Sequence, residues 1–251
     1  RAAALRRRAA DIAISYGAKS IGLGNALGVV AGRGAPLSKE VQAPVTTGHA
    51  STAWTCASIT EKAIAEHKLT DMPIGIFGFK GTVGEAVAQR LVSRGHRVLI
   101  NETGVAAKRA GEMGCEVVTR EDLLRQSPIL VGASTTGPIL DGRLLTHAKI
   151  LIDLALPPTL IPKTRPRGLR VYAGEPLQLP GPLRAGFWGR IWLAFAGYGR
   201  GCVYACLAEP LLGALNGPEF CHTNRRLTLE QTEAAGQALT AMGFTPVLRR
   251  R

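Results

Sequence analysis

Residues 74–84, IGIFGFKGTVG, decide the fold, because a short apolar run leads there into a loop with three glycines. Ile74–Phe77 has the length of a buried parallel strand, and Val83–Arg94 has the apolar pattern of a helix. A glycine loop between a strand and a helix is typical of a dinucleotide-binding turn. Its first glycine permits the tight turn, the second lets backbone approach the pyrophosphate, and the third lets the helix pack on the strand. The GxxGxxG spacing departs from the usual GxGxxG, which leaves a purely structural turn as the alternative.

Strands and helices alternate after this loop. The strand patterns are Arg97–Ile100, Glu116–Val118, Ile129–Val131, Ile150–Asp153 and Val171–Tyr172, and the helix patterns between them are Val105–Met113 and Glu121–Gln126. The alternation predicts an α/β fold with a Rossmann-like parallel sheet, from about Met72 to Ala173, and crossover helices. We expect a dinucleotide-binding Rossmann domain at 71–175. Residues 1–70 and the C-terminal helical part, 176–251, are expected to form a second α/β substrate lobe.

The flanking segments have their own patterns. Before the sheet, Arg1–Tyr16 reads as a helix, Ser20–Gly24 as a strand, Pro44–Gly48 as an extended segment with a turn, and Ser51–Glu66 as a helix. After the sheet, Leu177–Gly186 is rich in Pro and Gly and predicts a loop. Two helices, Ile191–Leu215 and Thr228–Met242, are expected to close the chain.

The expected cofactor is a nicotinamide dinucleotide whose pyrophosphate rests on the helix N-terminus after the loop. Its binding residues are predicted to be Gly78, Phe79, Lys80, Gly81, Thr82, Val83 and Gly84, together with Asn101, Glu102, Ala133 and Ser134. A carboxylate at the end of the second strand, such as Glu102, suits the ribose hydroxyls of NAD and repels a 2′-phosphate. Lys80, Lys108 and Arg109 are nearby cations that suit a phosphate, so NADH and NADPH both stay open. A solvated Glu102 at the start of a loop is the alternative.

The formal net charge is +13, with arginine clusters at 6–8, 225–226 and 249–251. A field of this sign favours acidic partners such as nucleic acid, anionic lipid or an acidic carrier protein, although a solvated basic surface explains it equally well. The chain has no nucleic-acid-binding motif and only 5% aromatic residues, so we expect no nucleic acid partner. Peripheral membrane contact is compatible with the charge.

Five cysteines without a secretory leader predict reduced thiols and a cytoplasmic location. Their spacing predicts no metal site; Cys202 and Cys206 would share a helix face, but no second ligand pair accompanies them. The apolar stretch Ile191–Leu215 carries Arg200, Glu209 and Pro210 and is too interrupted for a membrane span. The chain starts without Met, in what reads as the middle of a helix, which indicates a fragment.

Several collinear motifs resemble one family. They are TTGHASTA at 46–53, the glycine loop, Ile152-Asp153 with a following Pro, YACLAE at 204–209, HTN at 222–224 and GFTP at 243–246. This set is similar to the long-chain acyl-[acyl-carrier-protein] reductases of the aldehyde-forming, cyanobacterial type, which have TTGNTHTA, GATGDIG, FACFAE and GFQP in the same order. The likeness runs from about Gly22 to Pro246.

The resemblance implies reduction of a fatty acyl thioester, acyl-ACP or acyl-CoA, to a fatty aldehyde with NADPH, a reaction of lipid metabolism. It implies that Cys206 attacks the thioester, with His49 and His222 as candidate bases and Ser51 and Thr52 beside the developing oxyanion. A buried structural cysteine is the alternative for Cys206. The implied partners are an acidic acyl carrier protein or coenzyme A and an aldehyde-consuming enzyme.

Three departures from the family pattern matter. An N-terminal segment of the family is absent here, and Glu102 stands where the family has Arg, which places the preference for NADPH in doubt. Pro210 follows Cys206 by four residues and is expected to kink that helix. Two other functions therefore stay open: a non-covalent NAD(P)-dependent reductase or dehydrogenase of a small carbonyl or imine, and a non-enzymatic nucleotide-sensing module.

Overall fold

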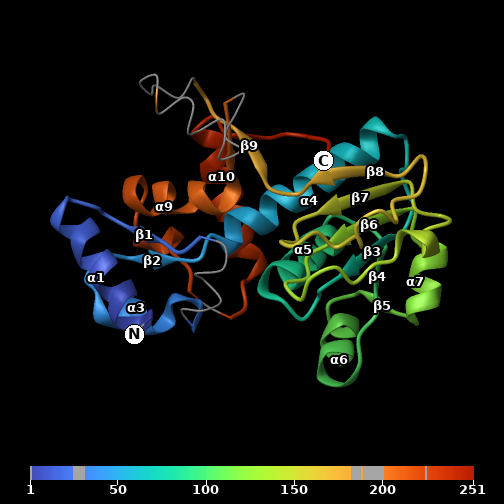
Figure 1. The fold of residues 1–251 in the computed structure, drawn as a ribbon, viewed down its shortest axis with the longest axis horizontal. Coiled ribbons are helices and arrows are strands. Elements are labelled where there is room, and N and C mark those ends of the chain that lie inside the picture. Colours follow the sequence, from blue (N-terminus) through green and yellow to red (C-terminus); the bar gives the residue numbers. More distant parts are fainter. Residues whose placement is uncertain (1, 25–31, 182–187, 189–200, 224) are drawn as a thin grey trace. The chain divides into compact units, whose positions relative to one another are not determined.

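The computed structural model describes residues 2–24, 32–181, 188, 201–223 and 225–251 (Figure 1). The chain divides into two compact units. The terminal unit comprises Arg1–Thr52 and Pro176–Thr245, and the central unit comprises Ala53–Glu175 and Pro246–Arg251. The division into 1–70, 71–175 and 176–251 stays a prediction.

The central unit is built on a six-stranded sheet. Its strands are β3 (Ile74–Phe77), β4 (Val98–Ile100), β5 (Glu116–Val117), β6 (Ile129–Gly132), β7 (Ile150–Asp153) and β8 (Arg170–Ala173). They are ordered β5-β4-β3-β6-β7-β8, and every neighbouring pair is parallel (Figure 1). The strand order reverses between β3 and β6, as it does in a Rossmann sheet. The predicted Rossmann-like α/β fold is confirmed.

The register aligns the carboxyl ends of four strands. Phe77 pairs with Gly132, Gly132 with Asp153, and Asp153 with Ala173. β3, β6 and β7 are buried along their whole length, which is why their sequences read as continuous apolar runs. Residues that follow these strands are therefore delivered to one edge of the sheet.

Three short crossover helices, α5 (Thr82–Ser93), α6 (Gly104–Glu112) and α7 (Arg120–Gln126), agree with the predicted ranges to within one residue at each end. The 3-10 helix η2 (Gly142–Leu144) was not predicted. α7 begins where it does because the Thr119 hydroxyl accepts a hydrogen bond from the amide of Asp122, at 3.1 Å. α4 (His49–Glu66) begins two residues before the predicted start.

The terminal unit contains shorter elements. They are α1 (Ala2–Ser15), β1 (Ile21–Gly22), η1 (Gly32–Gly34), α3 (Ala35–Glu40), β2 (Val45–Thr46), β9 (Pro176–Gln178), β10 (Cys202–Tyr204), α9 (Ala205–Leu215), η4 (Pro218–Phe220), α10 (Leu229–Ala241) and β11 (Thr245–Pro246), at which the unit ends. β1 and β2 pair in parallel, and a second sheet has the order β10-β9-β11. Ala10, Leu23, Leu37 and Val45 form a small apolar core.

Two predictions for the terminal unit are wrong in part. Leu177 and Gln178 lie in β9 rather than in a loop, and Cys202–Tyr204 is a strand rather than the middle of a helix. β10 pairs antiparallel with β9, and Gly201 at φ 71° separates it from the preceding residues. Cys202 therefore does not share a helix with Cys206; the predicted helical residues 191–200 lie outside the described ranges. Of the helices that are described, none is long and apolar enough to cross a membrane.

The central sheet predicts the cost of a core truncation. Leu130 in β6 has no exposed surface and packs with Leu99 and Leu123 in one cluster. We expect Leu130→Ala to lower the free energy of unfolding by about 2–5 kcal/mol, measured by urea denaturation, because it leaves a cavity between packed layers. Val117→Ala, at a strand position that is 43% exposed, should cost less than about 1 kcal/mol. Equal costs for the two variants would contradict this account of the core.

Candidate functional site

The glycine loop connects β3 to α5 and passes in contact with the chain after β6. Gly78 has φ 89°, and a Cβ there would lie 2.7 Å from the carbonyl carbon of Ala133 and from the amide nitrogen of Ser134. A Cβ at Gly84 would lie 2.3 Å from the carbonyl oxygen of Gly78. The loop therefore needs glycine at both positions, Gly78 for the tight turn and Gly84 for close packing of the helix.

The structure brings several predicted cofactor residues to this loop. The amide of Ala133 donates to the carbonyl of Phe77 at 2.9 Å, and the Ser134 hydroxyl lies 2.8 Å from that of Thr136. Gly81 is the N-cap of α5 and offers no side-chain acceptor to the first amides of the helix. An N-terminus of this kind suits the oxygen atoms of a phosphate.

The ends of β3 and β4 carry an ion pair. Lys80 Nζ lies 2.9 Å from Glu102 Oε2, and the Asn101 side-chain amide donates to the Val118 carbonyl at 3.0 Å. The Glu102 side chain is only 12% exposed, so it is not the solvated residue of the alternative interpretation. Phe79 is completely buried under the Arg109 guanidinium, 5.6 Å from its ring centroid, and holds the loop by packing.

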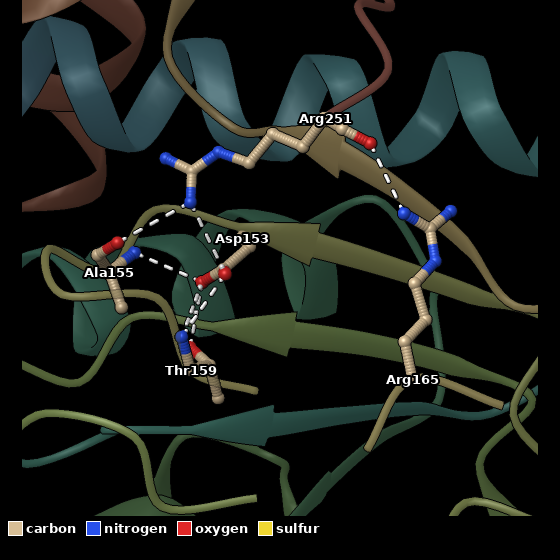
Figure 2. Close-up of polar contacts among 5 residues, drawn as sticks. All are labelled: Asp153, Ala155, Thr159, Arg165 and Arg251. Carbon is tan, nitrogen blue, oxygen red and sulfur yellow. Dashed lines mark hydrogen bonds and ion pairs between the residues drawn. The ribbon is translucent and has the colours of Figure 1, made fainter. Parts of the chain in front are cut away.

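A buried carboxylate ends β7 (Figure 2). Asp153 is 1% exposed and accepts hydrogen bonds from the Thr159 hydroxyl at 2.7 Å, the Thr159 amide at 3.1 Å and the Ala155 amide at 3.1 Å. The Arg251 guanidinium lies 3.3 Å from Oδ2, the oxygen that also accepts from the Thr159 amide; Figure 2 shows the contact. These four contacts offset the desolvation of the charge and hold Asp153 at the carboxyl edge of the sheet.

A second acidic residue follows β8. The pKa of Glu175 is raised from 4.5 to about 7, mainly by burial; the Arg251 guanidinium opposes this rise, and the nearby Asp153 adds a smaller increase. Burial, together with the charges of Glu175 and Asp153, also raises the pKa of the Cys56 thiol, which is therefore protonated at neutral pH.

The terminal unit holds a separate polar cluster. Glu209 of α9 is completely buried; it accepts a hydrogen bond from the Thr46 hydroxyl and, at 2.7 Å, one from the amide of Ser51. Ser51 lies in the first turn of α4, so the Glu209 carboxyl group accepts a hydrogen bond at that helix N-terminus, and burial raises the pKa of Glu209 against the opposing effect of its hydrogen bonds. The His222 carbonyl accepts from the amide of Thr47 at 3.1 Å and from its hydroxyl at 3.2 Å.

The residues predicted as catalytic lie in or beside this cluster. The Thr47 hydroxyl is 2.9 Å from His49 Nδ1, the Thr52 hydroxyl donates to the Gly48 carbonyl at 2.7 Å, and burial lowers the pKa of His222, so that its ring is neutral at pH 7. Cys206 lies half-buried in the first turn of α9, and a Cβ on Gly48 would lie 2.4 Å from its Cα. These contacts explain the residues by the packing and hydrogen bonding of the terminal unit. Their catalytic roles stay predictions.

Four polar residues with strong contacts were not predicted as site residues. Asp153 was noted only as part of a motif, Thr159 and Glu175 were not singled out, and Glu209 was noted only for its charge and in the YACLAE motif. Two of them could have been found from their positions in the sequence, because Asp153 ends a strand and Glu175 follows one by two residues. Among the described residues, no three His, Cys, Asp or Glu side chains are grouped as a metal site requires.

Comparison with known proteins supports a nicotinamide-binding role for the glycine loop. The family model for the NAD-binding domain of D-isomer specific 2-hydroxyacid dehydrogenases matches residues 41–138, which contain the whole glycine loop. The aminotransferase PigE of Serratia sp. is 26% identical over 165 residues, 61% of this chain and 19% of that protein. The chain thus spans about a fifth of this curated relative.

Two solved structures resemble parts of the chain. A phosphoglycerate oxidoreductase from Rhizobium etli has 19% identity and a TM-score of 0.31, over 46% of this chain and 44% of that one. Glutamyl-tRNA reductase from Methanopyrus kandleri has 21% identity and a TM-score of 0.35, over 59% of this chain and 41% of that one.

The predicted kinship with acyl-[acyl-carrier-protein] reductases is wrong. The family model that matches is the NAD-binding domain of 2-hydroxyacid dehydrogenases, and reduction of an acyl thioester to a fatty aldehyde is unsupported. The match supports an oxidoreductase with a nicotinamide cofactor and does not favour NADPH over NADH. The motifs that suggested otherwise have a structural explanation in the contacts of Glu209 and Gly48.

The buried acids predict a pH dependence of stability. The pKa of Glu175 is higher in the folded protein than in the unfolded chain, so folding favours its protonated form. The resulting contribution to the free energy of unfolding is fully present below pH 4.5 and is lost as the pH rises to about 7. Between pH 4.5 and 7.5 the wild type should therefore lose roughly 2–4 kcal/mol of unfolding free energy relative to Glu175→Gln. Urea denaturation at a series of pH values measures the difference; parallel curves for the two proteins would show that Glu175 titrates normally.

The cluster in the terminal unit predicts a second stability effect. Glu209→Ala leaves the Thr46 hydroxyl and the Ser51 amide buried without their acceptor, so we expect a loss of about 1–3 kcal/mol. The exposed Glu230→Ala should change stability by no more than about 0.5 kcal/mol. Denaturation followed by circular dichroism compares the two, and an unchanged Glu209→Ala protein would remove Glu209 from this structural role.

Proposed function

We propose that the chain is an oxidoreductase that transfers hydride between a nicotinamide cofactor and a small carbonyl or imine substrate, without a covalent enzyme intermediate. The observation that carries the proposal is the glycine loop at the point where the strand order reverses, between β3 and β6. Dinucleotides bind at this point in open α/β sheets.

The residues of the central unit fit such a cofactor. The loop from Gly78 to Gly84 presents close-packed backbone and the N-terminus of α5 to a pyrophosphate, and Glu102 follows the strand at which the adenosine ribose is read. The bound nicotinamide would supply the hydride. The chain's own residues would bind and orient it.

The substrate class is the finer part of the proposal. The matched family is described by its action on 2-hydroxyacids, so small 2-oxo acids come first among the carbonyl compounds to be tested. An acidic macromolecular partner stays a prediction, and it now depends on the net charge of +13 alone.

The first experiment tests the loop. A Cβ at Gly81 would lie 3.2 Å from the Gly78 carbonyl oxygen and 3.9 Å from that of Ala133, so Gly81→Ala requires a small shift of the loop backbone, and thermal unfolding has to confirm that the variant folds. It adds a methyl group where the pyrophosphate approaches. We expect NADH and NADPH binding, measured by fluorescence titration, to weaken by about tenfold or more, the effect of losing one charge-assisted contact.

Gly111→Ala is the matched control. Gly111 lies in α6, and a Cβ there meets nothing within 4 Å, so cofactor binding should be unchanged. Oxidation of NADH or NADPH in the presence of 2-oxo acids, aldehydes and imines then tests for turnover. Absence of cofactor binding in a folded wild-type protein would refute the proposal, and binding without turnover of any substrate would favour a nucleotide-sensing module.

A further inference from the structure

We propose that the ion pair of Lys80 and Glu102 makes the adenosine-ribose subsite accept NADH and NADPH with comparable affinity. This inference rests on the proposed function. Lys80 lies in the glycine loop after β3 and Glu102 follows β4, which pairs with β3 in parallel. The 2.9 Å contact of Nζ and Oε2 therefore joins the two positions from which a Rossmann site reads the cofactor's 2′ group.

The two partners of the pair differ in mobility. The Glu102 side chain is 12% exposed, whereas that of Lys80 is 64% exposed. A lysine ammonium on a flexible, largely solvated stem can turn from one acceptor to another. The cation can therefore move, while the carboxylate stays in place.

Each cofactor would use a different member of the pair. The ribose hydroxyls of NADH donate to the Glu102 carboxylate, which has a second oxygen for Lys80. The 2′-phosphate of NADPH receives the Lys80 ammonium, and the nearby cation offsets the repulsion that Glu102 alone would exert. A single carboxylate would select NADH, and a single cation would select NADPH.

The other charged side chains described at the loop add no net charge to the pair of Lys80 and Glu102. Arg109 Nε lies 2.8 Å from Glu85 Oε1, and the Arg109 guanidinium covers Phe79, the neighbour of Lys80. This second pair is also neutral overall. The side-chain amide of Asn101 is bonded to the Val118 carbonyl. The four charged groups at the loop therefore sum to zero.

The test compares the two cofactors on three proteins. Fluorescence titration with NADH and with NADPH should give dissociation constants within about fivefold of each other for the wild type, a difference of about 1 kcal/mol. Glu102→Gln should shift the ratio toward NADPH, and Lys80→Met toward NADH, each by about tenfold or more, because each variant leaves one uncompensated charge. The Glu102 side chain is only 12% exposed, so thermal unfolding has to confirm that the variants stay folded.

Glu116→Gln and Arg97→Met are the matched controls. These residues form an exposed pair, with Arg97 Nε 2.7 Å from Glu116 Oε1, and the loss of either charge should leave the ratio unchanged. A wild-type preference above about tenfold, or a ratio that neither loop variant moves, would overturn the inference but leave the proposed function intact. A folded wild type that binds neither cofactor would instead defeat the proposed function.

Discussion

The central unit depends on the backbone contact of Gly78 with the Ala133–Ser134 segment. After β3 the chain crosses toward β4, and after β6 it crosses toward β7, so the two loops diverge from adjacent strands. Any side chain at position 78 would collide with backbone that cannot move without displacing β6, which is buried along its length. The contact thus holds the loop, the start of α5 and the ends of both strands in one rigid arrangement, which is the preorganisation that a phosphate site requires.

The same sheet edge explains why the unit tolerates buried acids. Parallel strands deliver Asp153 and Glu175 to the carboxyl edge, where burial disfavours their charged forms. Asp153 has three protein donors and a guanidinium, whereas Glu175 shares that guanidinium without comparable support, and its pKa rises to about 7. The two carboxyl groups therefore differ in their supply of hydrogen-bond donors, and the pKa of Glu175, which has the smaller supply, is raised.

Much of the central unit could be predicted from the sequence, because its strands are short apolar runs separated by helical patterns and their parallel order follows from the alternation. The prediction failed at Cys202–Tyr204, where an apolar run is compatible with either a helix or a strand. Pairing with β9, which is distant in sequence, decided the outcome. The cofactor loop was found because its residues are contiguous. Glu209 was missed because its hydrogen-bond partners are set by tertiary contacts: Ser51 is 158 residues away along the chain. Thr159 is six residues from its partner Asp153, but the path of the intervening loop has no pattern in the sequence.

The motifs that suggested an acyl-thioester reductase belong together for a different reason. Residues 46–51 and 204–209 are the two sides of one packed cluster: Thr46 and Ser51 bind Glu209, and Gly48 lies against the backbone of Cys206. A chain that buries a carboxylate at the N-terminus of α4 needs a small residue, a hydroxyl and a glycine there, whatever reaction it performs. Collinear motifs of this kind therefore do not by themselves indicate a shared reaction. The reaction has to be inferred from groups that packing does not explain, and in this chain those groups lie around the glycine loop, where Lys80 and Glu102 form an ion pair at the surface.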